Sequence, residues 1–293
     1  MKRILPLIVL LLLPLGMDAQ KRSAKRTKTA AAPKTETPPP PLFTPQEERM
    51  LEGLEKVVVF DSVVINKREL FKAYPLLPSA GTLSWASEPG THPDSLLTTH
   101  PSRHTIAYGD KRVETYSTDS LSTAVGISWR FNGQWTEPEP LFQQTDALPS
   151  RQNFPYLMAD GQTVYFAQEE AEGLGGLDIY MTRQNSDRSG FYRPENIGMP
   201  FNSTANDYLL VIDDESGIGM FASDRRQAAD SVCIYYFIPS EIRNNYDGDA
   251  LTLETRLSLA RIDRIADTWT YGDTETINRF RKKLEALLKD IRK

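Results

Sequence analysis

Short apolar and aromatic runs alternate with clusters of Gly, Pro, Asn and Asp between about residues 80 and 240. This alternation predicts many short antiparallel β-strands joined by tight turns. The segment just before this region, KVVVFDSVVI at 56–65, predicts one or two further strands. A short helix is predicted upstream of it, with Thr44 as the cap and Pro45 at the first helical position.

The C-terminal part changes to helical periodicity. Segments 251–269 and 274–293 both predict helices, separated by Tyr-Gly-Asp at 271–273. The apolar residues of the second helix fall on one face, and they are Ile277, Phe280, Leu284, Leu287, Leu288 and Ile291. We therefore expect a helical hairpin over 251–293. Its amphipathic helix, 274–292, either caps an edge of the β region or offers a docking surface to a partner.

The β region repeats itself, which indicates a repeat architecture. The recurring segments are HTIAYGD at 104–110, QTVYFAQ at 162–168 and GIGMFAS at 217–223. Their matched positions are separated by 58 and 55 residues, and a second strand recurs at Ile127, Ile179 and Ile234. Each unit holds about four short strands, the size of a propeller blade. Three units are too few to close a ring, so strands within 46–97 would complete it, or the sheets form an open fan.

These patterns predict a mainly β protein: a small or partial β-propeller with a C-terminal α-helical appendage. The predicted segments are a signal peptide at 1–19, a disordered basic and Pro-rich tether at 20–45, an N-terminal helix and strands at 46–97, propeller repeats at 98–242, and the helical hairpin at 251–293.

The N-terminus has the three-part layout of a secretory signal peptide. Lys2 and Arg3 precede an apolar run at 4–15, and Ala19 ends the segment. The run is short for a permanent membrane span, although an uncleaved anchor is the alternative. We expect export to the periplasm, with an extracellular location as the alternative, and no transmembrane span after cleavage.

Charge and cysteine content narrow the function classes. The formal net charge of −5 argues against a nucleic-acid partner, which requires a concentrated basic surface. The single cysteine, Cys233, lies in the apolar run VCIYYF, where a buried and inert thiol is expected.

The stretch GLGGLDIY at 173–180 is the clearest candidate for a ligand loop. A phosphate loop would precede a helix, whereas an alternating, strand-like segment follows here. The carboxylates around it are not in the order of a calcium loop, and they are Glu169, Glu170, Glu172 and Asp178. We favour a tight turn, in which the glycines allow positive φ and close backbone approach and Asp178 accepts from backbone amides. A calcium-stabilised scaffold remains an alternative.

Other residues give little support for catalysis. His92, His100 and His104 lie in one loop-rich segment, where Pro101 prevents a helical metal site. Asp-Asp-Glu-Ser at 213–216 aligns with a predicted hairpin turn. We therefore expect no enzyme activity, no metal and no other cofactor. The rival is a propeller glycan hydrolase, which would need converging carboxylates.

The second unit carries a distinctive order of motifs. An apolar-Pro stretch precedes Asp-Gly and an aromatic strand, a Gly-rich turn precedes Asp-Ile-Tyr, and a Pro-x-Asn-x-Gly run follows. The residues expected to have structural roles in this repeat are Pro155, Asp160, Gly161, Gly173, Gly175, Gly176, Asp178, Tyr180, Pro194, Asn196 and Gly198. Over about 149–223 this order resembles the TolB-like (WD-like) β-propeller repeat of bacterial cell-envelope proteins. Tyr192 stands where the family usually has Trp, while Trp135 keeps the Trp in the first unit.

The resemblance implies a propeller that holds partners. Several relatives carry peptidoglycan-binding domains, of which this chain has no recognisable copy. The expectation is therefore a non-catalytic periplasmic scaffold that binds an envelope protein or a peptidoglycan-associated partner.

Overall fold

The structure is a computed structural model that describes residues 43–86, 100–119, 122–141, 151–171, 173–246 and 251–291. The predicted signal peptide and nearly all of the predicted tether lie outside these residues, as do His92 and Glu172. The expectations for those positions therefore stay predictions.

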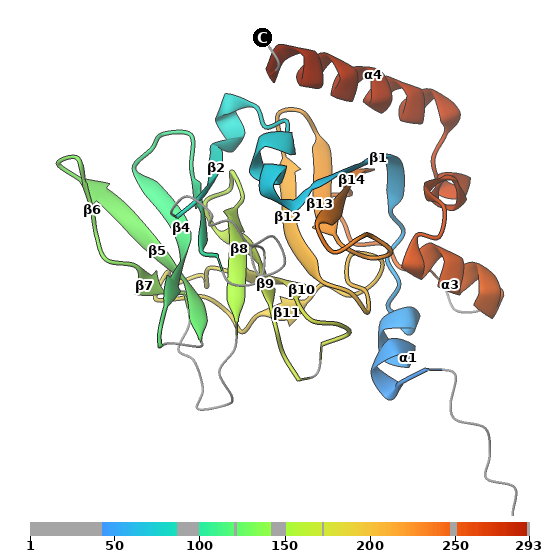
Figure 1. Ribbon diagram of the computed structural model, residues 1–293, viewed down its shortest axis with the longest axis horizontal. Coiled ribbons are helices and arrows are strands. Elements are labelled where there is room, and N and C mark those ends of the chain that lie inside the picture. The colour runs from blue at the N-terminus through green and yellow to red at the C-terminus, as the bar shows by residue number, and fades with distance from the viewer. Residues whose placement is uncertain are drawn as a thin grey trace, which may run out of the picture. The chain divides into compact units, whose positions relative to one another are not determined.

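The described strands form three antiparallel sheets, which makes the protein mainly β, as predicted (Figure 1). The first sheet has the order β2-β3-β4-β5-β6, and β7 also pairs with β5. Its strands are β2 (Thr82–Trp85), β3 (Ser102–Thr105), β4 (Lys111–Ser117), β5 (Thr123–Phe131), β6 (Gln134–Trp135) and β7 (Glu139–Pro140).

The second and third sheets have four strands each. The second sheet runs β11-β10-β9-β8, with β8 (Gln152–Leu157), β9 (Thr163–Gln168), β10 (Asp178–Arg183) and β11 (Glu195–Asn196). The third sheet runs β1-β14-β13-β12, with β1 (Val58–Asn66), β12 (Asp207–Asp213), β13 (Ile218–Ser223) and β14 (Ser231–Ile238).

The N-terminal segment enters two of these sheets. β1 pairs antiparallel with β14 and supplies the fourth strand of the third sheet, with Val58 opposite Ile238 and Asn66 opposite Ser231. β2 adds an outer strand to the first sheet through its pairing with β3. These strands therefore complete sheets that the repeats begin, and among the described residues they form no fourth sheet.

Two apolar layers separate the three sheets. Val113 and Ile127 of the first sheet pack with Val164 and Phe166 of the second. Between the second and third sheets, the buried side chains are Ile179, Leu210, Phe221, Cys233, Tyr235 and Phe237, together with Ile197 and Phe201 of the connecting segment. Each layer thus consists of apolar side chains from the facing surfaces of two neighbouring sheets.

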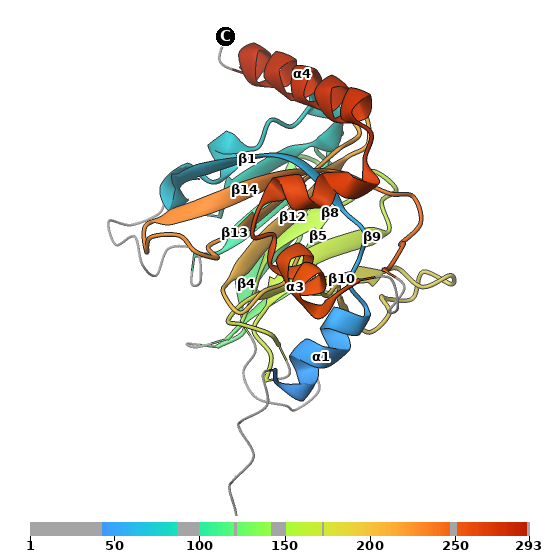
Figure 2. The ribbon, with the colours of Figure 1, turned by 90° about the vertical axis from the view of Figure 1, so that its right-hand side faces the viewer.

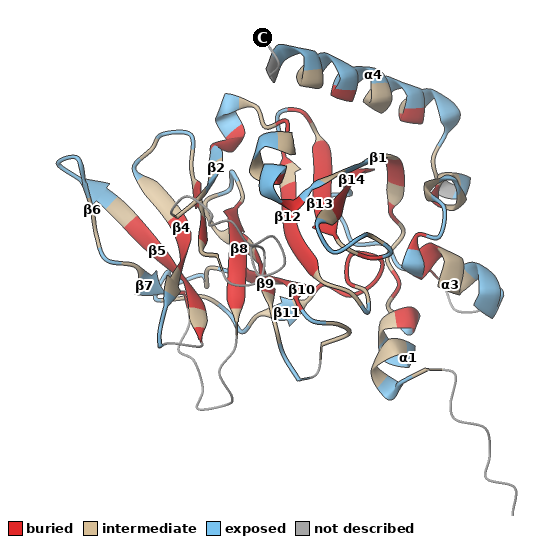
Figure 3. Cartoon of the chain, viewed as in Figure 1, coloured by how far each residue is buried: buried red, intermediate tan, exposed pale blue. Residues whose placement is uncertain are grey.

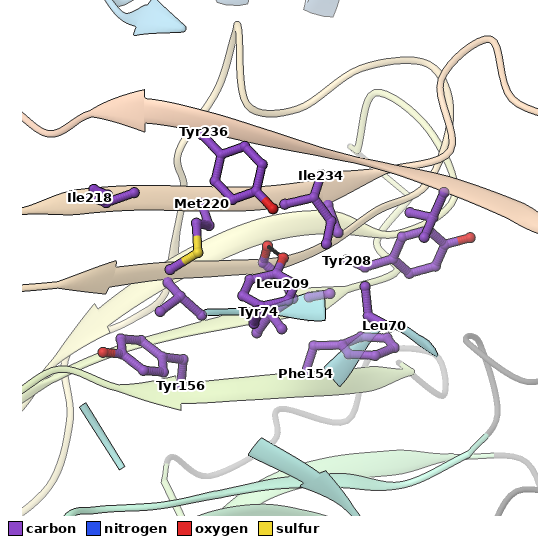
Figure 4. Packing of buried hydrophobic residues seen from close by; sticks show 14 of the residues in the cluster. Leu70, Tyr74, Phe154, Tyr156, Tyr208, Leu209, Ile218, Met220, Ile234 and Tyr236 are labelled. Carbon is purple, nitrogen blue, oxygen red and sulfur yellow. Dashed lines mark hydrogen bonds between the residues drawn. The ribbon is translucent and has the colours of Figure 1, made fainter. Parts of the chain in front are cut away.

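The other face of the third sheet is covered by residues of β8, by the 3₁₀ turns that follow β1 and by α4 (Thr274–Ile291). Met220, Ile234 and Tyr236 pack there against Phe154 and Tyr156 of β8 and against two residues from the 3₁₀ turns that follow β1, Leu70 and Tyr74 (Figure 4). Tyr74 also donates a hydrogen bond from its hydroxyl to the Leu209 carbonyl oxygen, at 3.0 Å. The side chains on this face of the sheet are therefore as buried as those in the layers between the sheets.

The helices lie around the third sheet (Figure 2). They are α1 (Pro45–Glu52), α3 (Leu253–Arg261), a 3₁₀ segment at Ile265–Tyr271, and α4 (Thr274–Ile291). The predicted cap of α1 is confirmed, because the Thr44 side chain accepts from the Glu47 amide and the Glu47 side chain accepts from the Thr44 amide.

The C-terminal part differs from the predicted two-helix hairpin. Ile262 adopts a left-handed conformation with φ 50°, which ends α3 early, and the 3₁₀ segment follows. α3 packs on α1, while α4 lies along β1. Figure 3 shows the buried and intermediate positions of α4 on the side that faces the sheet.

α4 and the 3₁₀ segment also satisfy the open edge of β1. The Val59 amide donates to Thr268 Oγ1 at 3.0 Å, and Trp269 Nε1 donates to the Val59 carbonyl at 2.7 Å. Arg281 Nε donates to the Phe60 carbonyl at 2.9 Å. Unpaired strand edges tend to recruit other chains, so this capping keeps β1 from doing so at these residues. The amphipathic helix was predicted either to cap an edge of the β region or to offer a docking surface, and the described contacts fit the first role.

We expect Leu284→Ala to destabilise the protein by about 2–5 kcal/mol, because Leu284 is 2% exposed and its removal leaves a cavity under α4. Chemical denaturation measures the change, with Lys282→Ala on the exposed side of the same helix as the matched control. Equal stability of the two variants would mean that α4 does not pack on this sheet in solution.

Candidate functional site

The Gly-rich stretch lies in the loop between β9 and β10, against the segment that connects the second sheet to the third. The Gly176 amide donates to the Ala205 carbonyl at 3.3 Å, and the Leu177 amide donates to Asn206 Oδ1 at 3.1 Å. The Asp207 amide returns a bond to the Leu177 carbonyl at 2.7 Å. At Gly176 and Leu177 the loop is therefore a backbone junction between sheets.

The glycines of this loop are required because another segment of the chain packs closely against its backbone. A Cβ on Gly175 would overlap the carbonyl oxygen of Ala205, and one on Gly176 would overlap the Asn206 side chain. Neither these residues nor Gly173 has a positive φ, so that part of the sequence interpretation is wrong. The loop excludes side chains because a second backbone lies against it.

Asp178 is the centre of the junction. It is 1% exposed, and its Oδ2 accepts hydrogen bonds from the Leu174 amide at 2.6 Å and from Asn196 Nδ2 at 3.0 Å. Oδ1 has no partner among the described residues. Burial raises the pKa of Asp178 to about 6. The carboxylate thus accepts from backbone amides of its own turn, as the sequence indicated.

Asn196 extends this network into the Pro-x-Asn-x-Gly run. Its Oδ1 accepts from the Gly198 amide and from Asn202 Nδ2, both at 2.8 Å. Asn202 in turn bonds both the amide (2.7 Å) and the carbonyl (2.8 Å) of Ile179 in β10. Gly198 has φ 74°, which a side chain would strain. The run therefore folds back onto β10 through side-chain amides.

The earlier motif positions form a bulge and a turn. Pro155 lies in β8 where the register with β9 shifts, a place where a missing N–H does not interrupt the ladder. Asp160 Oδ1 accepts from the Gln162 and Thr163 amides, both at 2.8 Å, and Gly161 has φ 68°. Asp160 and Gly161 therefore form the β8–β9 hairpin turn.

The turn at 213–216 is built in the same way. Asp213 Oδ1 accepts from the Glu215 amide at 3.1 Å and from the Ser216 amide at 3.2 Å. The prediction of a hairpin turn at this position is confirmed.

Two buried carboxylates, Asp178 and Asp207, interact, since the charge of Asp207 helps to raise the pKa of Asp178. Asp207 is 0% exposed and pairs with Arg225 at 2.7 Å. Neither carboxylate is open to solvent, so a glycosidic bond cannot reach them. The pair serves the junction between the second and third sheets.

The described histidines and the cysteine have structural surroundings. His104 is 1% exposed, with Nε2 2.7 Å from the Ala80 carbonyl and Nδ1 accepting from the Leu157 amide at 3.2 Å. Burial lowers the pKa of His104 to about 4, so the ring is neutral and both nitrogens are used. Cys233 is buried in the third sheet, as predicted, and burial raises the pKa of its thiol.

The carboxylates weighed for calcium have protein donors around them. Glu169 pairs with Arg151, and Glu170 accepts from the Tyr180 hydroxyl at 2.7 Å. Within the described ranges, no group of three or more His, Cys, Asp or Glu side chains is placed to hold a metal ion.

Tyr180 and Asn196 also line a groove beside α1. Tyr180 is 5% exposed, its ring stacks on Phe166 at 6.2 Å, and burial raises the pKa of its hydroxyl. The groove consists of two adjoining depressions, with volumes of about 390 and 470 Å³, that share Gln46 and Arg49. Sequence reasoning missed Arg49 and Arg193 here, because only tertiary packing brings α1 to this place.

A second exposed feature is the aromatic tip of the first sheet, formed by Tyr108, Phe131 and Trp135. Tyr108 is 91% exposed and Phe131 65% exposed. The Arg130 amide donates to the Asp110 carbonyl at 2.7 Å, which holds the β3–β4 turn beside the β5–β6 hairpin. Asn-Gly at 132–133 makes the hairpin turn with positive φ at both residues, and this dipeptide is the pattern that could have located the tip.

No protein-family model matches this chain, and no curated protein matches it either. Across the described ranges, no helix combines the length and apolarity needed to cross a membrane.

Gly175→Ala and Gly176→Val should each destabilise the protein by about 1–3 kcal/mol, since the new side chain must displace the facing segment. Gly190→Ala is the control, because an added Cβ there meets only one atom at 3.9 Å. Thermal melts would contradict the junction if all three variants matched the wild type.

Asp178→Asn tests the buried carboxyl. A pKa near 6, against about 3.9 in an unfolded chain, means that the native state keeps the proton of this carboxyl up to a higher pH than the unfolded chain does. Wild-type stability should therefore decrease relative to the variant as the pH rises from about 4 to about 6.5, by up to about 3 kcal/mol. Asparagine keeps an oxygen that can accept from Leu174 and Asn196, so the variant removes the titrating group and retains these hydrogen bonds. If the difference in unfolding free energy between wild type and variant did not change with pH, the raised pKa of Asp178 would be contradicted.

Proposed function

We propose that this chain is a non-catalytic scaffold of the bacterial cell envelope, a partial β-propeller that holds a protein or peptidoglycan-associated partner. The residues that resemble the TolB-like repeat support this proposal because they hold the turns and strands together. Asn196 donates a hydrogen bond to Asp178 of β10 and accepts one from the Gly198 amide. These positions therefore build the scaffold, and binding falls to exposed loops held by it.

The aromatic tip is the observation that carries the proposal. Tyr108 and Phe131 are large apolar side chains held in solvent by two adjoining turns. Trp135 lies opposite Arg130 in the β5–β6 pair, with the Arg112 guanidinium 4.3 Å and that of Arg130 6.0 Å from its ring centroid. Tyr, Trp and Arg are the residues that most often dominate the energy of protein interfaces.

The proposed location is the periplasm. It rests on the three-part pattern of residues 1–19, in which basic residues, an apolar run and a small residue follow in order. The tether that follows would give the scaffold reach from its point of attachment if the leader is retained.

A photo-crosslinking amino acid placed at Phe131 tests the proposal in intact cells. We expect it to trap a discrete envelope component, and Tyr108→Ala in the same chain should weaken the association by at least about 1 kcal/mol. Because Tyr108 is 91% exposed, this change should leave the melting temperature unaltered.

Ile242 provides the control position, since it is 72% exposed and apolar but lies after β14. The same adducts from both positions, or adducts from Phe131 that persist in the Tyr108 variant, would contradict binding at the tip.

A further inference from the structure

The cap on the edge of β1 stops part of the way along the strand. The 3₁₀ segment bonds Val59, and the bond from Arg281 of α4 to the Phe60 carbonyl is the last one along the edge. β1 itself continues to Asn66 as the end strand of the third sheet, beside β14 (Figure 2). We call residues 62–66, which follow the capped part, the open edge.

The register with β14 shows which backbone groups of the open edge point away from the sheet. The Lys67 amide donates to the Asp230 carbonyl at 2.9 Å, so Lys67 faces β14, and so does every second residue before it. The intervening residues direct their N–H and C=O groups outward, and they are Ser62, Val64 and Asn66.

Some of these outward groups already have partners. The Ser62 amide donates to Asp61 Oδ1 at 2.8 Å, and the Asn66 carbonyl accepts within the 3₁₀ turn that begins at Lys67. The Ser62 carbonyl, both backbone groups of Val64 and the Asn66 amide have no hydrogen-bond partner among the described residues. Groups of this kind are a template for a further strand.

The open edge is complementary to itself. If a second copy paired antiparallel with it about a two-fold axis at Val64, Val64 would lie opposite Val64 and Ser62 opposite Asn66. Each Val64 amide would donate to the other Val64 carbonyl, and each Asn66 amide to the opposite Ser62 carbonyl. The unpaired groups of one copy would thus be satisfied by the same groups of the other, with the existing bonds kept.

The cap selects this register over its neighbours. With the axis at Val64, the residue opposite Asp61 is Lys67, where β1 has ended, so each strand stops where the cap of the other begins. A shift by two residues in one direction would bring Asn66 against the capped Phe60. A shift in the other direction would shorten the pairing.

The side chains of the open edge favour the same arrangement. Val63 and Val64 are 39% and 56% exposed. In the paired register Val63 would lie opposite Ile65 of the second copy and the two Val64 side chains would be neighbours, and such β-branched pairs stabilise antiparallel sheets. Asp61 of each copy would lie close to the exposed Arg68 of the other, which brings opposite charges together at both ends.

We propose that a second copy of this chain pairs with the open edge of β1, through a two-fold axis at Val64. The pairing joins two four-stranded sheets into one continuous sheet. Because the paired segment is short, the dimer forms reversibly and dissociates on dilution.

Sedimentation velocity over a wide range of protein concentration tests this pairing. Wild type should form a dimer whose population rises with concentration. Val64→Lys and Val64→Glu should each raise the dimer dissociation constant at least about tenfold, because like charges then lie directly opposite each other. Ile242→Lys is the matched control, since Ile242 is 72% exposed but lies after β14, and it should dimerise as the wild type does.

A mixture of the two charged variants tests the position of the axis. The new lysine of one chain would face the new glutamate of the other, so the mixture should regain a dimer that contains one chain of each kind. Both variants should fold, because exposed strand edges tolerate charged side chains. A wild type that is monomeric at every concentration, a dimer that neither variant weakens, or a mixture that stays monomeric would overturn the proposal. None of these results bears on the aromatic tip, which belongs to the first sheet.

Discussion

The pairing of β1 with β14 is the interaction on which the third sheet and the helices around it depend. It gives the third sheet its fourth strand from the opposite end of the chain, and the 3₁₀ segment and α4 can cap that strand only once it is in place. The pairing continues beyond the strand, because Glu55 bridges Asn245 and the Tyr246 amide donates to the Leu54 carbonyl at 3.0 Å. These bonds set α1 against α3, and so they also position the groove.

Chemistry that is local in the sequence could be predicted. The cap at Thr44, the turn at Asp160–Gly161 and the buried thiol at Cys233 each depend on a few neighbouring residues, and the structure confirms them. The predictions that failed concern residues whose contacts lie far away in the sequence. Nothing near Gly175 reveals that Ala205 lies against it, so positive φ was an equally good explanation of a glycine there. Arg49 and Arg193 are far apart in sequence, and the groove that joins them was invisible for the same reason.

Acidic residues near glycines were the hardest part of the sequence to interpret. The hydrogen-bond donors around each carboxylate show which role it has. A carboxylate that awaits a cation is surrounded by other oxygens, whereas Asp178 and Asp160 are surrounded by amides. Asp207 is neutralised by a buried guanidinium at 2.7 Å. At these turns and junctions, the carboxylates of Asp160 and Asp178 accept from backbone amides that have no strand partner.

The long separation between β1 and β14 also fixes an order of folding. The N-terminal strand leaves the ribosome first, yet its partner is made more than a hundred residues later. Until then the apolar residues of β1 have no sheet to join, and closing so long a loop is slow. The first and second sheets consist mostly of strands close together in the chain, so they can form during this wait. A chain interrupted before Ser231 would therefore expose β1 indefinitely, which makes incomplete products of this protein natural targets for proteases and chaperones.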